Sequence, residues 1–162
     1  MARPAKIGVP YFPADVDMFQ DRKIKRLLRS VSTKGFTIYL YLLTEIYREE
    51  GYFYRWDEHS AFDISDDLHL TESAVEETVK ACCAIGLFNK DMYTNMSVLT
   101  SASIQERWQK IVTDANRKVT EILPELDLLS GFTGFLVEET PKKSEETPKS
   151  PGKVHKEKKR IV

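Results

Sequence analysis

The sequence predicts a mainly helical domain with a small antiparallel β-sheet, arranged as a winged helix-turn-helix. Three observations predict this class. Apolar residues recur at helical spacing through most of residues 18–123, and a tight turn at residues 68–71 joins two of the expected helices. Two short apolar runs, 87–89 and 98–100, follow Gly86 and have the length of hairpin strands. The chain of 162 residues, 41% of them hydrophobic, is long enough for one domain with a core.

The first element is an extended arm over residues 1–16, because its three prolines fix φ and discourage helix. Within the arm, Tyr11 and Phe12 are expected to dock on the core. Asp17 is expected to cap a first helix over residues 18–31, whose apolar positions follow helical spacing and whose other faces are basic.

A central core helix comes next. It is expected to begin at Ser32 or Thr33 and to end near Glu50, because six apolar residues form a wide stripe along it. Gly51 is expected to stop this helix. The aromatic run at residues 52–54 is typical of a strand.

The helix-turn-helix follows. Its first helix is predicted over residues 58–68 and its second over residues 72–84, with Thr71 as the N-cap and Gly86 as the stop. The two strands after Gly86 would form the wing, with residues 90–97 as the hairpin tip. Together with the strand before the helix pair they give the three short strands of a winged helix.

The C-terminal part changes in character along its length. A long helix is predicted over residues 101–123, and it completes a winged-helix domain at residues 17–123. Residues 124–137 are apolar enough to dock, without a clear structural prediction. Residues 138–162 contain the near-repeat EETPKKS and EETPKS and no aromatic residue, so they predict a disordered low-complexity tail or linker.

Several protein classes are disfavoured by the sequence. Neither a signal peptide nor a membrane span is found, and the adjacent pair Cys82 and Cys83 is typical of reduced thiols, which predicts a cytoplasmic protein. His59 and His69 show no metal-ligand spacing with the cysteines or acids. The glycines form no phosphate-binding loop, and no catalytic constellation is present. We therefore expect no enzyme, no metal and no cofactor.

Five spaced blocks of the sequence carry a resemblance to a known family. They are YFPADVD at 11–17, the helix 39–51 whose last residues together with Tyr52 read YREEGY (47–52), GLF at 86–88, VLTS at 98–101 and IQERW at 104–108. Over about residues 7–120, the chain resembles the N-terminal domain of phage-type replisome organisers, which are DnaD-like primosome proteins. The resemblance implies a winged helix involved in DNA binding and replication initiation. It also implies a linker to a second, helper-recruiting part, and it implies no catalytic residue.

Charge is unevenly distributed along the chain although its net value is only −1. Residues 57–77 contain eight acids and no Lys or Arg, so the expected recognition helix presents more carboxylates than cations, and phosphates would repel it. Residues 22–34 contain no acid and form the stronger phosphate-binding candidate. The candidate DNA-binding residues are Arg22, Lys23, Lys25, Arg26, Arg29 and Lys34 from the basic cluster, Ser73 and Lys80 from the recognition helix, and Lys90 and Asn95 from the wing.

The leading functional hypothesis is a DNA-binding winged-helix module of the replication-initiation type, making non-specific phosphate contacts and working with replication proteins. One alternative is a protein-interaction or dimerisation winged helix, in which the acidic and basic faces pair between subunits. A transcriptional regulator is a further alternative, because it shares the fold.

Overall fold

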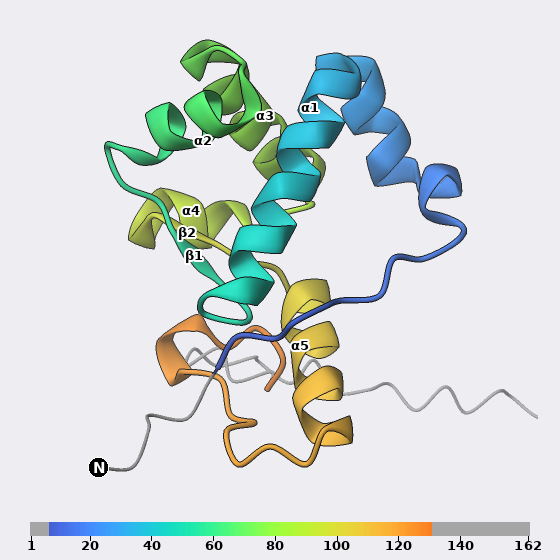
Figure 1. Ribbon diagram of the computed structural model, residues 1–162, viewed down its shortest axis with the longest axis vertical. Coiled ribbons are helices and arrows are strands. Elements are labelled where there is room, and N and C mark those ends of the chain that lie inside the picture. Colours follow the sequence, from blue (N-terminus) through green and yellow to red (C-terminus); the bar gives the residue numbers. More distant parts are fainter. Residues whose placement is uncertain (1–6, 131–162) are drawn as a thin grey trace, which may run out of the picture. The chain divides into compact units, whose positions relative to one another are not determined.

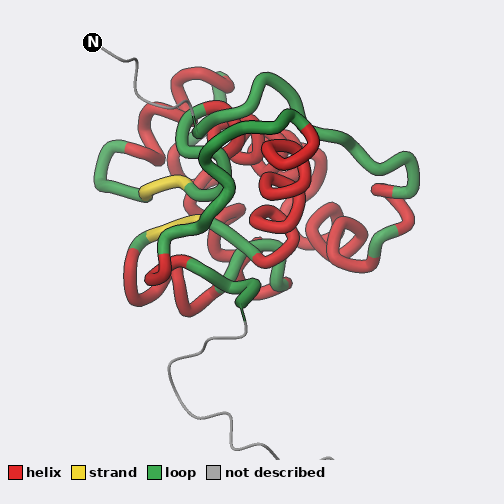
Figure 2. Tube along the Cα trace, turned by 90° about the horizontal axis from the view of Figure 1, so that it is seen from below, coloured by secondary structure: helices red, strands yellow, loops and turns green. Residues whose placement is uncertain are grey.

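The computed structural model describes residues 7–130. Residues 1–6 of the predicted arm, the predicted tail, and the part of the predicted docking segment beyond Ser130 lie outside the described residues. The described part is mainly helical with a small antiparallel sheet, as the sequence predicts (Figures 1 and 2). Its elements are η1 (Met18–Gln20), α1 (Arg22–Arg48), β1 (Tyr54–Arg55), α2 (Ser60–Leu68), α3 (Glu72–Ile85), α4 (Lys90–Met96), β2 (Val98–Leu99), α5 (Ala102–Asp114) and η2 (Pro124–Leu126).

The arm is anchored at residues 7–12 by main-chain and aromatic contacts. The Val9 amide donates to the Tyr47 carbonyl at 2.7 Å, and the Phe12 ring stacks on the Tyr47 ring with centroids 4.7 Å apart. The Trp108 indole donates to the carbonyl of Ile7 at 2.8 Å. Phe12 is therefore an anchor, as predicted, whereas Tyr11 is 71% exposed and the prediction for that residue is wrong.

Helix α1 begins later than predicted. The carboxylate of Asp21 accepts from the amides of Lys23 at 2.7 Å and Ile24 at 3.3 Å, so Asp21 is the N-cap. Asp17 makes no side-chain cap, because the chain around it forms the short helix η1 instead. The predicted cap at Asp17 is thus wrong by four residues.

A sharp break divides α1 at Ser32, which has φ 62° and ψ −168°. Figure 1 shows the two halves steeply inclined to each other. Gly35 lies just beyond the break, and a Cβ added there would come within 1.9 Å of Val31 Cγ2, so only glycine fits without rearrangement. The sequence prediction of two helices that meet at Ser32 or Thr33 is confirmed.

The helix-turn-helix segment follows its predicted boundaries closely. Helix α2 ends at Leu68, and its C-cap His69 adopts a left-handed conformation with φ 56°. The hydroxyl of Thr71 caps α3 by accepting from the Ala74 amide at 3.1 Å, and Gly86 ends α3 with φ 96°. The predictions for Thr71 and Gly86 are confirmed.

The predicted wing is the main correction. Residues 90–96 form helix α4, because the side chain of Asn89 accepts from the Met92 amide at 2.9 Å and starts a helix where a hairpin tip was expected. The strand predicted at residues 87–89 is not formed. The strand predicted at 52–54 is shifted to Tyr54–Arg55, and it pairs antiparallel with β2 as Tyr54↔Leu99 and Arg55↔Val98.

Helix α5 is shorter than the predicted span of residues 101–123. It ends at Asp114, and Asn116 then turns the chain in a left-handed conformation. The chain folds back until Leu126, which is 1% exposed, joins the core. None of the helices within residues 7–130 is long and apolar enough to cross a membrane.

The core lies where the second half of α1 packs against α3 and where the aromatic residues around the sheet meet α5. Its largest fully buried side chains include Trp108, Tyr47 and Phe88. The ring of Tyr52 packs against Trp108 with centroids 4.7 Å apart. This core fixes the first half of α1 and the exposed side of α3, the two surfaces that carry the candidate DNA-binding residues.

Candidate nucleic-acid interface

The first half of α1 presents four cations on one exposed side. Ile24 and Leu27 are buried in the core, Leu28 and Val31 are partly buried against it, and the four cations are solvent-exposed. Residues separated by three or four positions share a helix face. We name this surface the α1 basic face, which consists of Arg22, Lys25, Arg26 and Arg29. Within residues 7–130, the ion pairs of the structure use none of these four side chains.

Lys23 points elsewhere. Its ammonium donates to the carbonyl oxygen of Gly86 at 3.1 Å, so it ties the start of α1 to the end of α3. A cation at a helix C-terminus interacts favourably with the carbonyls that have no intrahelical partner. The structure therefore gives Lys23 a role within the fold and separates it from the α1 basic face.

Lys34 lies beyond the break in α1, close to the acidic helix α3. A small cavity of about 340 Å³ is lined by both Arg29 and Lys34, together with Glu77 and Thr78 of α3. A carboxylate is thus brought beside two cations at this point. Lys34 extends the positive surface towards α3, where the carboxylate Glu77 lines the same cavity.

The exposed side of α3 is acidic, as the sequence indicates. Val75, Val79 and Cys82 are buried, while Ser73 and Lys80 are exposed between carboxylates. The exposed acids of the helix pair are Asp63, Asp66 and Asp67 on α2 and Glu72, Glu76 and Glu77 on α3. We name these six residues the α2–α3 acidic face. Such a surface repels phosphates, so α3 is poorly suited to entering a DNA groove.

Lys90 and Asn95 were predicted on a hairpin tip but lie on helix α4. Both are exposed, so they remain accessible. They lie on a different helix from the α1 basic face. The described residues contain no hairpin tip at residues 90–97 that could enter a DNA groove.

The two cysteines are unpaired and buried in α3. Burial raises the pKa of Cys83 to about 11 although the nearby Lys90 lowers it, and burial raises the pKa of Cys82 further. Between residues 7 and 130 there is no group of three or more His, Cys, Asp or Glu side chains placed to hold a metal ion.

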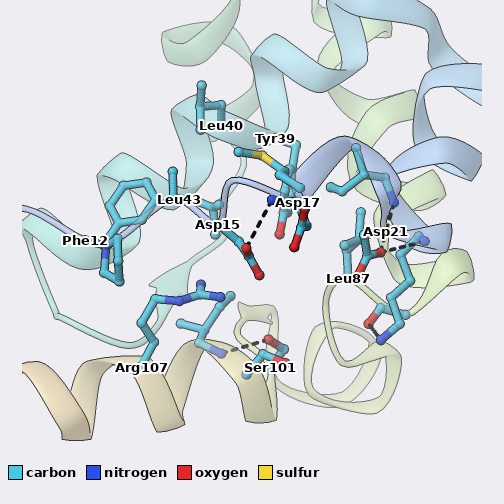
Figure 3. Close-up of a pocket in the computed structure, with 18 of the residues that line it drawn as sticks. Phe12, Asp15, Asp17, Asp21, Tyr39, Leu40, Leu43, Leu87, Ser101 and Arg107 are labelled. Carbon is cyan, nitrogen blue, oxygen red and sulfur yellow. Dashed lines mark hydrogen bonds between the residues drawn. The ribbon is translucent and has the colours of Figure 1, made fainter.

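A larger cavity that sequence reasoning missed lies beneath the arm, and we name it the arm cavity. It has a volume of about 450 Å³ (Figure 3). Its walls come from the arm, α1, the end of α3 and the start of α5. The charged residues that line it are Asp15, Asp17, Asp21, Lys23 and Arg107. The only sequence signal is the pair Asp15 and Asp17 at the end of the arm, because the walls lie far apart in the chain.

Comparison with known proteins places the chain in a family. The model of the family described as Lin1244/Lin1753-like, N-terminal, matches residues 11–104. The chain belongs to this family. It is also 31% identical, over 108 residues, to the "Uncharacterized phage-related protein Lin1244/Lin1753" of Listeria innocua serovar 6a. That alignment covers 67% of this chain and 35% of the relative, so the chain spans about a third of the relative's length. No solved structure matches the chain.

Proposed function

We propose that this domain binds DNA through the α1 basic face, as a non-catalytic module acting in the cytoplasm in the replication initiation of a phage or mobile element. The observation that carries the proposal is the set of four exposed cations on one helix face that form no ion pair within residues 7–130. Such charges are available to phosphates without first breaking a contact of the fold.

The dimensions of the face suit a nucleic-acid strand. Arg22 and Arg29 are seven residues apart in one helix, which corresponds to a rise of about 10 Å. That length matches about three nucleotide steps at 3.4 Å per charge along one strand of B-DNA. Three of the four cations are arginines, whose planar fork can donate two hydrogen bonds to one phosphate.

The same surface charges argue against base-specific recognition by α3. Three of its exposed residues are glutamates, which phosphates on both sides of a groove would repel. We therefore propose non-specific phosphate contacts, without assigning a base-reading helix. In this proposal, DNA contacts α1, and not α3, which is the helix that a winged helix normally places in the groove.

The replication role is supported by the resemblance to phage-type replisome organisers and by the phage-related name of the listerial relative. A transcriptional regulator is the competing role for a DNA-binding module of this fold. Deletion of the gene from its phage or element separates the two roles. A replication role requires that the copy number of the element falls while transcript abundance per template is unchanged.

Direct DNA binding is tested by fluorescence anisotropy with the full chain and labelled single-stranded and duplex DNA, at about 50 and 200 mM salt. The proposal expects binding at low salt and at least tenfold weaker affinity at the higher salt, because counterions are released from the phosphates. Absence of binding to both DNA forms at low salt would contradict it.

The α2–α3 acidic face favours a second candidate function, docking of a basic protein surface, including the α1 basic face of a second copy. Sedimentation velocity at low and high ionic strength tests the second copy as the partner. A dimer that dissociates in salt, and that is lost in an Asp63→Asn, Asp66→Asn, Glu76→Gln variant, would support it. A monomer at every ionic strength would exclude self-association through this face.

A further inference from the structure

We propose that the arm cavity is a docking site for a basic amphipathic segment of a partner protein, with one apolar side chain of that segment inserted into the cavity. This site is distinct from the α1 basic face, and the proposal does not depend on DNA binding. It rests on three features of the described residues: apolar side chains in the cavity lining, an acidic rim, and exposed apolar side chains at or next in sequence to the lining residues.

Apolar side chains from several elements line part of the cavity. Ile24, Tyr39 and Leu43 contribute from α1, and Leu87 and Ile104 contribute from the end of α3 and from α5. The volume of about 450 Å³ lies in the range of cavities that hold ligands, roughly 300–1,000 Å³. This part of the lining favours an aliphatic or aromatic side chain over a charged one.

The rim of the cavity carries the negative charge. Asp15 on the arm and Asp17 just after it face the open space across from Arg107 (Figure 3). No Lys or Arg occurs between residues 7 and 21. The Asp15 carboxylate accepts only from the Asp17 amide at 3.1 Å, and within the described residues neither aspartate forms an ion pair.

The two cations that line the cavity are both held by contacts within the domain. The ammonium of Lys23 donates to the Gly86 carbonyl at 3.1 Å. The guanidinium of Arg107 donates to the Tyr47 hydroxyl at 3.0 Å. The lining therefore has three carboxylates against two engaged cations, and its net charge favours a partner with Lys or Arg beside its apolar anchor.

Exposed apolar side chains extend this surface beyond the cavity. Val16 is 96% exposed, and Tyr11, Phe19 and Leu40 are also exposed. These four account for more than half of the seven large apolar side chains exposed within residues 7–130. Leu40 itself lines the cavity, and Tyr11, Val16 and Phe19 each adjoin in the sequence a residue that lines it. Exposed apolar side chains beside a cavity are a feature of interaction sites. A segment with apolar residues on one face and basic residues beside them would cover both the patch and the rim.

The test uses a fluorescein-labelled helical peptide of about 14 residues, four turns, with leucines on one face and lysines on the other. A matched peptide carries glutamate in place of every lysine. Anisotropy with the full chain should show binding of the Leu/Lys peptide and at least tenfold weaker binding of the Leu/Glu peptide. A chain with Asp15→Asn and Asp17→Asn should bind the Leu/Lys peptide at least fivefold more weakly, and Leu40→Glu should weaken it as well.

The control chain carries Asp63→Asn and Asp66→Asn, which remove the same charge from α2. This chain should bind the Leu/Lys peptide as the wild type does. Thermal unfolding of each variant should show an unchanged midpoint, because all four aspartates are exposed.

The docking proposal would be overturned by equal binding of the two peptides, by no binding, or by a loss of binding in the Asp63 and Asp66 chain alone. The Asp15 and Asp17 chain should retain DNA binding. Failure of the peptide test therefore leaves the proposed DNA function standing, and failure of the DNA test leaves this one standing.

Discussion

Gln105 shows how one buried side chain holds the C-terminal segment against the domain. It is completely buried in α5. Its amide nitrogen donates to the Leu126 carbonyl at 2.6 Å and to the Thr100 hydroxyl at 3.2 Å, and its amide oxygen accepts from the Leu128 amide at 2.8 Å. The sequence could not show this role, because a glutamine between apolar helix positions is usually solvated.

Replacing Gln105 with leucine should leave the Leu126 carbonyl and the Leu128 amide without partners. Each buried unsatisfied group costs about 1–3 kcal/mol, so we expect the free energy of unfolding to fall by about 2–3 kcal/mol. Urea denaturation measures this. The neighbouring exposed residue gives the control, because Glu106→Ala should change stability by less than about 0.5 kcal/mol. Equal effects of the two substitutions would contradict the role assigned to Gln105.

The buried Cys83 thiol should make stability depend on alkaline pH. Its pKa is about 11 in the folded state, above the ordinary value of about 8.5. The unfolded chain therefore loses this proton first, and stability that is complete below about pH 8.5 is lost as pH rises towards 11. Cys83→Ala should reduce the fall in unfolding free energy between pH 8.5 and 10, as measured by urea denaturation at each pH. An identical fall in both chains would contradict the prediction.

At the scale of elements, the break in α1 sets the direction of the α1 basic face. Ser32 occupies a region of φ and ψ that is normally reserved for glycine, and a residue held there costs about 1–3 kcal/mol. The two halves of α1 keep this conformation because each packs separately on the core, through Ile24 and Leu27 in the first half and Ile38 and Leu42 in the second.

Ser32→Gly should relieve this strain and raise the free energy of unfolding by about 1 kcal/mol, after allowance for the flexibility of glycine in the unfolded chain. Ser30 provides the matched control, because it lies in a regular exposed part of the same helix. There the same change should lower stability by about 0.5 kcal/mol. Thermal or urea unfolding compares the two, and a loss of stability in both would show that the break carries no strain.

Most elements could be predicted from sequence because their signals are local. Thr71 starts α3 as its N-cap, and Gly86 ends α3 with a left-handed turn. Both signals depend on residue type alone. The wing could not be predicted in the same way. Asn89 is compatible with either a turn or an N-cap, and only tertiary packing around the buried Phe88 selects the helix.

The candidate sites also differ in whether local sequence could predict them. The α1 basic face could be predicted because four cations recur within eight residues of one helix. The role of Lys23 could not, because its partner Gly86 is 63 residues away in the chain. The arm cavity was invisible for the same reason, since its walls join the arm to α1, α3 and α5.

At the scale of the whole molecule, a net charge of −1 conceals two surfaces of opposite sign. The α1 basic face and the α2–α3 acidic face belong to one domain, since α1 and α3 pack directly against each other. Under the proposed function, phosphates would be attracted by the α1 basic face and repelled by the α2–α3 acidic face, which would favour a single orientation of the domain on DNA.

The central claim is that the α1 basic face makes the phosphate contacts, and the salt dependence of DNA affinity tests it most directly. The test chain carries Arg22→Gln, Lys25→Gln, Arg26→Gln and Arg29→Gln, with Lys23 kept because of its contact with Gly86. The control chain loses the same charge from exposed cations outside the first half of α1, through Arg48→Gln, Arg55→Gln, Lys110→Gln and Lys118→Gln.

For duplex DNA, each neutralised phosphate contributes about 0.9 to the slope of log affinity against log salt concentration. The slope of the test chain should fall by about 3 in magnitude and its affinity at about 100 mM salt should drop more than tenfold, while the control chain should stay close to wild type. Equal slopes and equal affinities for the test chain and the wild type would contradict it.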